Sequence, residues 1–188
     1  MEHDLTGKKV AILVADGFET DELLKPRDAL RQAGAETQVV SPCGHRVKGR
    51  RHDKAGRSVK VDVPLNEADP ADYDALLLPG GVQNPDTLRM DPKAVQFVKQ
   101  FFEDHKPVAA ICHGPWTLVE ADVVRGRRMT SYQSIRTDLR NAGAEWVDEE
   151  VVVDNGLVTS RKPDDIPAFN AKMLEEFAEG RHEQQQAA

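Results

Sequence analysis

Short, unbroken apolar runs alternate along the chain with longer segments in which apolar residues recur at helical spacing. The unbroken runs predict buried strands at residues 8–14, 37–41, 75–78 and 107–111. The helical spacing predicts helices at residues 23–33, 91–104, 115–124 and 163–177. Pro26 lies inside the first helical pattern, where it either begins a helix in its first turn or kinks one. Strands that alternate with helices favour a mostly parallel sheet covered by helices on both faces.

Smaller elements fill the rest of the chain. Glycines and an alternating apolar pattern predict a small hairpin excursion at residues 44–63, and Asn155-Gly156 predicts a tight hairpin between residues 150–154 and 157–160. Residues 129–131 form a short separate piece, residues 138–142 a helical turn, and residues 179–188 a polar tail that we expect to be frayed. Because no repeat or linker interrupts it, residues 1–188 form a single α/β domain with its core at about residues 8–177.

The composition is that of an ordinary globular protein. The chain has 188 residues, of which 39% are hydrophobic, and no apolar stretch approaches the ~18–20 residues of a membrane span. The N-terminal residues lack the basic and apolar regions of a secretory signal, so we expect a cytoplasmic protein without a membrane partner.

The charge balance argues against nucleic acid as the main partner. The 25 Lys and Arg residues against 32 Asp and Glu residues give a formal net charge of −7, whereas a nucleic-acid binder needs a cationic face. The local exception is the segment 46–60, which holds seven Lys and Arg residues against the single acid Asp53. We interpret this segment as a solvated hairpin, and nucleic-acid binding through it is the least favoured function.

The sequence AICHGP at residues 110–115 carries the main candidate chemistry. A buried strand runs directly into Cys112 and then into a helix start, which is the arrangement of a nucleophile elbow. The free N–H groups of the helix favour a thiolate, so we expect a lowered pKa for Cys112. A buried structural cysteine is the alternative. Cys43 has neither an adjacent His nor a helix start, and we expect it to be inert.

Other polar residues and glycines follow the ends of the predicted strands. His113 is either an exposed histidine or a base close enough to take the proton of the thiol. The turn at Gly80 and Gly81 lets backbone N–H groups approach a ligand, where they and the N–H of His113 are placed to stabilise an oxyanion. Glu19 and Glu22 follow the first strand and either complement the dipole of the helix or belong to the site. The His and Cys residues lack metal-ligand spacing, so no metal is expected.

Together these motifs resemble the ThiJ/PfpI family, within the class I glutamine-amidotransferase-like superfamily. The resemblance extends from about Lys8 to Phe177, and its most specific parts are the Cys-His-Gly-Pro elbow and the upstream Gly-Gly turn. It implies a flavodoxin-like three-layer sandwich, a Cys112 nucleophile and a contact between Glu22 and the sulfur. Because an ionised carboxylate would oppose thiolate formation, Glu22 assists only when it is protonated.

The same resemblance implies further residues and partners. In PfpI-type relatives, an acid that follows the Gly-Gly turn of a neighbouring subunit pairs with the histidine, and the matching residues here are Asp86 and His113. This pairing implies a homodimer or a larger assembly of dimers. Trp116 is bulkier than the polar residue found in many relatives, and we expect it to narrow the substrate pocket.

The resemblance implies a stress-response enzyme in which Cys112 attacks small reactive carbonyl compounds, with a glyoxalase-like or deglycase-like hydrolase activity and no cofactor. An intracellular cysteine peptidase acting on peptide substrates is the alternative, because both reactions begin with attack of the thiolate on a carbonyl carbon. A non-catalytic redox sensor or chaperone, in which Cys112 is oxidised, is the second alternative.

Overall fold

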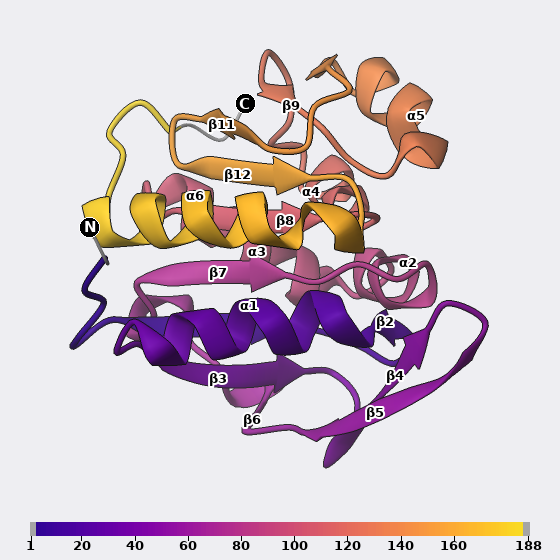
Figure 1. Ribbon diagram of the computed structural model, residues 1–188, viewed down its shortest axis with the longest axis vertical. Coiled ribbons are helices and arrows are strands. Elements are labelled where there is room, and N and C mark those ends of the chain that lie inside the picture. Colours follow the sequence, from indigo (N-terminus) through magenta and orange to yellow (C-terminus); the bar gives the residue numbers. More distant parts are fainter. Residues whose placement is uncertain (1–2, 186–188) are drawn as a thin grey trace.

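A central sheet with the strand order β11-β12-β8-β7-β1-β3-β6 organises the fold. The computed structural model describes residues 3–185, and Figure 1 shows the sheet between its helices. The strands of this sheet are β1 (Lys9–Leu13), β3 (Glu36–Ser41), β6 (Val63–Pro64), β7 (Ala75–Leu78), β8 (Val108–Ile111), β11 (Val152–Asp154) and β12 (Leu157–Ser160). Neighbouring strands run parallel, except that β11 pairs antiparallel with β12. The predicted mostly parallel α/β sheet is therefore confirmed.

Helices cover both faces of the sheet and create two separate cores. The helices are α1 (Thr20–Gln32), α2 (Gln83–Arg89), α3 (Pro92–Glu103), α4 (Pro115–Glu120), α5 (Arg136–Asn141) and α6 (Ile166–Glu179). α1 and α6 pack on one face against Val10 and Ile12, whereas α3 and α4 pack on the other against Ala11 and Leu13 (Figure 1). Strands between two helical layers bury both of their faces, which explains the unbroken apolar runs of the sequence.

The predicted excursion at residues 44–63 is a hairpin beside the carboxyl end of the sheet. Its strands β4 (Arg46–Arg51) and β5 (Lys54–Lys60) pair antiparallel, and β4 also pairs with β2 (Phe18–Glu19). A second small sheet joins β9 (Arg128–Met129) to β10 (Glu145–Trp146). The hairpin extends outward from the carboxyl ends of the strands, where the functional residues of the sequence gather.

Three local predictions differ from the structure. α1 begins at Thr20 and contains Pro26 in its interior, so Pro26 does not start the helix. α4 ends at Glu120 instead of residue 124, because Asp122 adopts a positive φ of 54° that an α-helix cannot continue through. α2 was not predicted, because its short polar sequence around a proline lacks an apolar periodicity.

The C-terminal segment also differs from the expected frayed tail. The N–H of His182 donates to the carbonyl oxygen of His105 at 2.9 Å, and the side-chain amide of the fully buried Gln185 donates to the carbonyl of Lys106. Residues 181–185 are thus folded back onto the loop between α3 and β8, and the prediction of fraying is wrong for them; residues 186–188 lie outside the described residues. Within residues 3–185, no helix combines the length and the apolar character that a membrane crossing requires.

Candidate active site

Cys112 occupies a strained turn between β8 and α4. Its φ is 62°, a left-handed conformation that costs a residue other than glycine about 1–3 kcal/mol. Two hydrogen bonds hold this turn: the N–H of Cys112 donates to the carbonyl of Ser160 at 3.0 Å, and its carbonyl accepts the N–H of Tyr132 at 2.8 Å. Gly114 is required beside it, because a Cβ there would lie 2.6 Å from the carbonyl oxygen of Leu78. The strand-to-helix elbow predicted from the sequence is confirmed.

Glu22 lies beneath this turn in the first part of α1. Its side chain is fully buried, and it contacts the thiol of Cys112. One carboxyl oxygen, Oε2, accepts the N–H of Gly80 at 2.9 Å, whereas Oε1 is buried without a hydrogen-bond partner among residues 3–185. The prediction that Gly80 supplies an oxyanion donor is wrong, because its N–H group is already donated to Glu22. Gly80 instead positions the carboxyl group.

The acidities of Glu22 and Cys112 depend on one another. Burial raises the pKa of the Glu22 carboxyl from 4.5 to about 8. Burial, and the negative charge of Glu22 when it is ionised, raise the pKa of the Cys112 thiol. The expected lowering of the Cys112 pKa is therefore not found, because burial of the sulfur outweighs the helix start. Below about pH 8 Glu22 retains its proton, so its charge no longer opposes a thiolate and its O–H can donate to the sulfur.

Two backbone N–H groups oppose the rise in the pKa of the Cys112 thiol. Those of Gly81 and His113 are both directed at Cys112 and act to lower the pKa of its thiol. Gly81 has a φ of 80°, and a Cβ at this position would lie 2.8 Å from the backbone nitrogen of Glu19. Only glycine brings the turn after β7 this close to the sulfur. The two N–H groups form a site for negative charge on the sulfur or on an oxygen bonded beside it.

His113 is a buried residue held between two polar groups. Its Nδ1 lies 3.1 Å from the sulfur of Cys112, and its Nε2 lies 3.0 Å from the hydroxyl oxygen of Ser134. The ring of Tyr132 stacks on the imidazole with centroids 4.8 Å apart. Burial lowers the pKa of His113, which favours the neutral ring that can accept a proton. Of the two alternatives from the sequence, the base within reach of the thiol is the one found.

The sulfur lies at a cavity of about 980 Å³ formed mainly by loops at the carboxyl ends of the strands. Glu19 and Asp86 line this cavity, as the sequence predicts for site residues. The carboxylate of Glu19 accepts the N–H of His52 at 3.0 Å. Asp86 belongs to the first turn of α2, and within residues 3–185 the hydrogen bonds of the His113 ring go to Cys112 and Ser134 instead.

Trp116 is absent from the lining of this cavity, although the sequence predicts that it narrows the pocket. Its indole N–H donates to Asp138 at 2.7 Å, and the guanidinium of Arg89 lies over its ring. The indole contacts His113 only through an edge-to-face arrangement, with centroids 5.8 Å apart. Trp116 therefore packs against His113 without lining the cavity.

Several cavity residues were missed by the sequence reasoning. Tyr132 and Ser134 belong to a segment without periodicity, and only the hydrogen bond from Tyr132 to the elbow brings them to His113. Arg50 and His52 come from the basic hairpin, which was interpreted as solvated but forms one wall of the cavity. The cluster of positive charge in that hairpin was the one feature of the sequence that could have indicated a role for Arg50 and His52.

Comparison with known proteins places this arrangement in a family. The model of the DJ-1/PfpI family matches residues 8–176, which is most of the chain. The chain belongs to the DJ-1/PfpI family. The resemblance drawn from the elbow and the Gly-Gly turn is thereby confirmed.

Individual members of the DJ-1/PfpI family show the same relationship. Protein/nucleic acid deglycase 2 of Escherichia coli (strain K12) is 50% identical over 169 residues, covering 89% of this chain and 96% of that protein. YraA of Bacillus subtilis (strain 168), named as a candidate cysteine protease, is 46% identical over 168 residues, covering 89% of this chain and 96% of that protein.

Among solved structures, the DJ-1/ThiJ/PfpI-like part of a two-domain protein from Anabaena variabilis superimposes with a TM-score of 0.84 at 40% identity. The match covers 89% of this chain but 47% of that protein, which also contains a ferritin-like domain. The superposition confirms the flavodoxin-like arrangement of sheet and helices.

Proposed function

We propose that this protein is a cysteine-dependent hydrolase that acts on small reactive carbonyl compounds, with deglycase-like or glyoxalase-like activity. The observation that carries the proposal is the environment of the Cys112 sulfur. It contacts the buried carboxyl of Glu22, receives two backbone N–H groups, lies 3.1 Å from Nδ1 of His113 and opens to a cavity. The deglycase name of the Escherichia coli relative supports a deglycase-like activity.

In the proposed first step, the sulfur of Cys112 forms a bond with the carbonyl carbon of the substrate. The π electrons of the C=O bond move to the oxygen, and the N–H groups of Gly81 and His113 bind the resulting oxyanion. The proton of the thiol passes to Nδ1 of His113, while the Nε2–H of the ring donates to Ser134. His113 later returns this proton to the adduct or to a leaving amine.

We assign Glu22 the role of holding a proton beside the sulfur. A protonated carboxyl stabilises the thiolate by a hydrogen bond and carries no charge that repels it. Glu22→Gln, which keeps a donor in this place, should retain most of the activity, whereas Glu22→Leu should not.

We further infer that the chain forms a homodimer in which Asp86 of the partner subunit approaches His113. In support, the ring of His113 makes no hydrogen bond to Asp86 of its own chain among residues 3–185, so the pairing that the resemblance implies needs a second subunit. A nearby carboxylate would favour the protonated imidazole that forms when the thiol gives up its proton.

Peptide hydrolysis is the second candidate function. The specific observation in its favour is the cavity of about 980 Å³, which exceeds the space that a dicarbonyl compound needs and which Trp116 does not obstruct. The name of YraA points to the same activity. The two reactions share the thiolate attack, so only their substrates separate them.

A comparison of two substrates tests the proposal. Turnover of methylglyoxal and of an unstructured peptide is measured for the wild type, Cys112→Ala and His113→Ala, with Cys43→Ala as the matched cysteine control. We expect dicarbonyl turnover that Cys112→Ala abolishes, that His113→Ala lowers and that Cys43→Ala leaves unchanged.

Peptide cleavage that depends on Cys112, without dicarbonyl turnover, would replace the proposal by the peptidase function. Turnover of neither substrate, combined with selective oxidation of Cys112 by dilute peroxide, would favour the redox-sensor function instead.

A further inference from the structure

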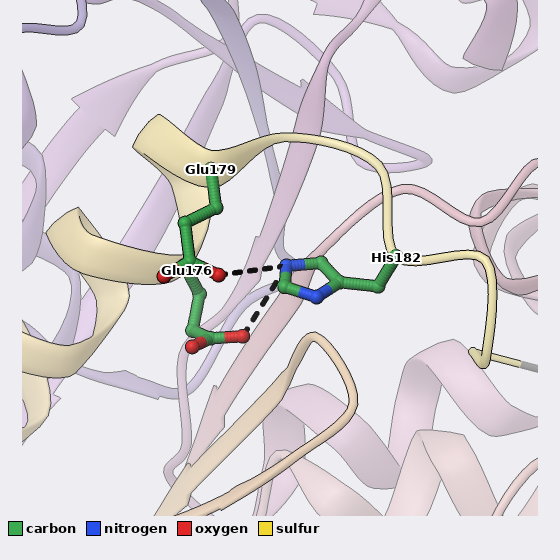
Figure 2. Close-up of side chains that lie close together, drawn as sticks. All are labelled: Glu176, Glu179 and His182. Carbon is green, nitrogen blue, oxygen red and sulfur yellow. Dashed lines mark ion pairs between the residues drawn. The ribbon is translucent and has the colours of Figure 1, made fainter.

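Three potential metal ligands meet at the C-terminal end of α6, far from the cavity. Figure 2 shows that Glu176 and Glu179 extend from the last turns of the helix toward the ring of His182, which follows the helix in the chain. One ligand atom from each residue lies within 4.8 Å of the others. Among residues 3–185, no other three His, Cys, Asp or Glu side chains bring their ligand atoms this close.

The distances within this cluster match those around a bound ion. The Nε2 atom of His182 lies 3.3 Å from Oε2 of Glu176 and 4.0 Å from Oε2 of Glu179. A tetrahedral Zn²⁺ ion holds nitrogen and oxygen ligands at about 2.0–2.2 Å, which separates any two ligand atoms by about 3.3–3.6 Å. A small inward rotation of the exposed Glu179 side chain completes the set.

The cluster also holds a polar atom that has no hydrogen-bond partner among the described residues. Nε2 of His182 is buried and has no hydrogen-bond partner among the described residues, although the carboxylate of Glu176 is only 3.3 Å away. The Glu176 side chain is itself 9% exposed. Burial of a ring nitrogen without a hydrogen-bond partner is costly, and a cation bound to Nε2 removes that cost.

The backbone holds the cluster in place before any ion binds. Gly180 ends α6 with a φ of 84°, which turns the chain back toward the helix. The N–H of His182 is anchored to His105, and the ring packs on Gly156, where a Cβ would lie 2.7 Å from the ring carbon Cδ2. The end of a helix carries a partial negative charge that attracts cations. The two negative charges of the carboxylates then neutralise the double positive charge of one divalent ion, and a neutral imidazole adds no charge.

We propose that Glu176, Glu179 and His182 bind one divalent transition-metal ion of the Zn²⁺ class, which fixes the C-terminal segment to α6. The imidazole selects a transition metal over Mg²⁺ or Ca²⁺, which prefer oxygen ligands. The sequence did not predict this set of ligands, because the prediction of no metal rested only on the spacing of His and Cys residues. The site is independent of the proposed activity at Cys112.

Calorimetric titration of the full, untagged chain with ZnCl₂ tests the site. The double variant Cys43→Ser, Cys112→Ser serves as the background, so that thiolates do not contribute to binding. We expect one Zn²⁺ ion per chain and an affinity that falls at least tenfold in His182→Ala and in Glu179→Gln. Glu175→Gln is the matched control, because this neighbouring half-buried glutamate pairs with Lys172 and does not belong to the cluster.

A second measurement separates ligation from a general loss of charge. Co²⁺ in a site with three protein ligands gives visible absorption bands, and these should disappear in His182→Ala but remain in Glu175→Gln. Circular dichroism confirms that each variant is folded; Glu179 is 57% exposed, so its replacement leaves packing intact. Absence of Zn²⁺ binding, or binding that neither His182→Ala nor Glu179→Gln weakens, overturns the proposal.

Discussion

Replacing Glu22 by Gln should change how the stability of this protein depends on pH. The Glu22 carboxyl is buried and keeps its proton up to about pH 8, whereas in the unfolded chain it ionises near 4.5. A group whose pKa is raised by folding contributes its full stability below the unfolded pKa and loses it as the pH rises through the folded pKa. Gln has nearly the same shape and does not titrate, so the variant lacks this dependence.

The magnitude follows from the two pKa values. Each tenfold change in ionisation is worth about 1.4 kcal/mol, so a rise from 4.5 to about 8 makes at most about 5 kcal/mol of stability sensitive to pH. Most of this range lies between pH 5 and pH 8. The free energy of unfolding of Glu22→Gln should therefore rise relative to that of the wild type by about 3 kcal/mol over this interval.

Urea unfolding followed by tryptophan fluorescence at pH 5, 6, 7 and 8 measures this difference. Titration of the groups outside the coupled pair of Glu22 and Cys112 contributes equally to both proteins and cancels in the comparison. Glu103→Gln is the matched control, since Glu103 is exposed at the end of α3 and its replacement should leave the pH dependence unchanged. A difference between Glu22→Gln and the wild type that stays constant within about 0.5 kcal/mol from pH 5 to pH 8 would refute the reasoning about burial.

Three further outcomes are expected. Gly81→Ala should lower the free energy of unfolding by about 1–3 kcal/mol or more in denaturant titrations, because φ is 80° and the added Cβ would collide with the carbonyl of Gly17; unchanged stability would contradict this. Trp116→Phe should leave KM within twofold of the wild type in steady-state kinetics, since the indole lies outside the cavity. A large rise in KM would show that the indole contacts the substrate. Sedimentation at micromolar concentration should find a dimer, and Asp86→Asn should lower turnover. A monomer, or unchanged kinetics of Asp86→Asn, would contradict the pairing of Asp86 with His113 across a dimer interface.

Local sequence determined the elements and the position of Cys112, the proposed nucleophile. The alternation of unbroken apolar runs with helical spacing placed the central strands and most helices, because burial on one or two faces leaves a periodic trace in the residues themselves. The elbow at Cys112 was equally visible, since a tight strand-to-helix turn needs small residues next to it in the chain. Elements without such a trace, namely α2 and the segment around Tyr132, stayed hidden.

Tertiary structure decided the environment of those same residues. The sequence placed Glu22 and Cys112 at two strand ends, but only the packing of α1 under the elbow makes the carboxyl fully buried, which sets its pKa and that of the thiol. Contacts between residues far apart in the chain also bring Ser134 to His113, turn Trp116 away from the cavity and fold His182 back onto α6. Hydrophobic periodicity and turn sterics act over a few residues, whereas desolvation and hydrogen-bond partners depend on which distant segments the sheet brings together.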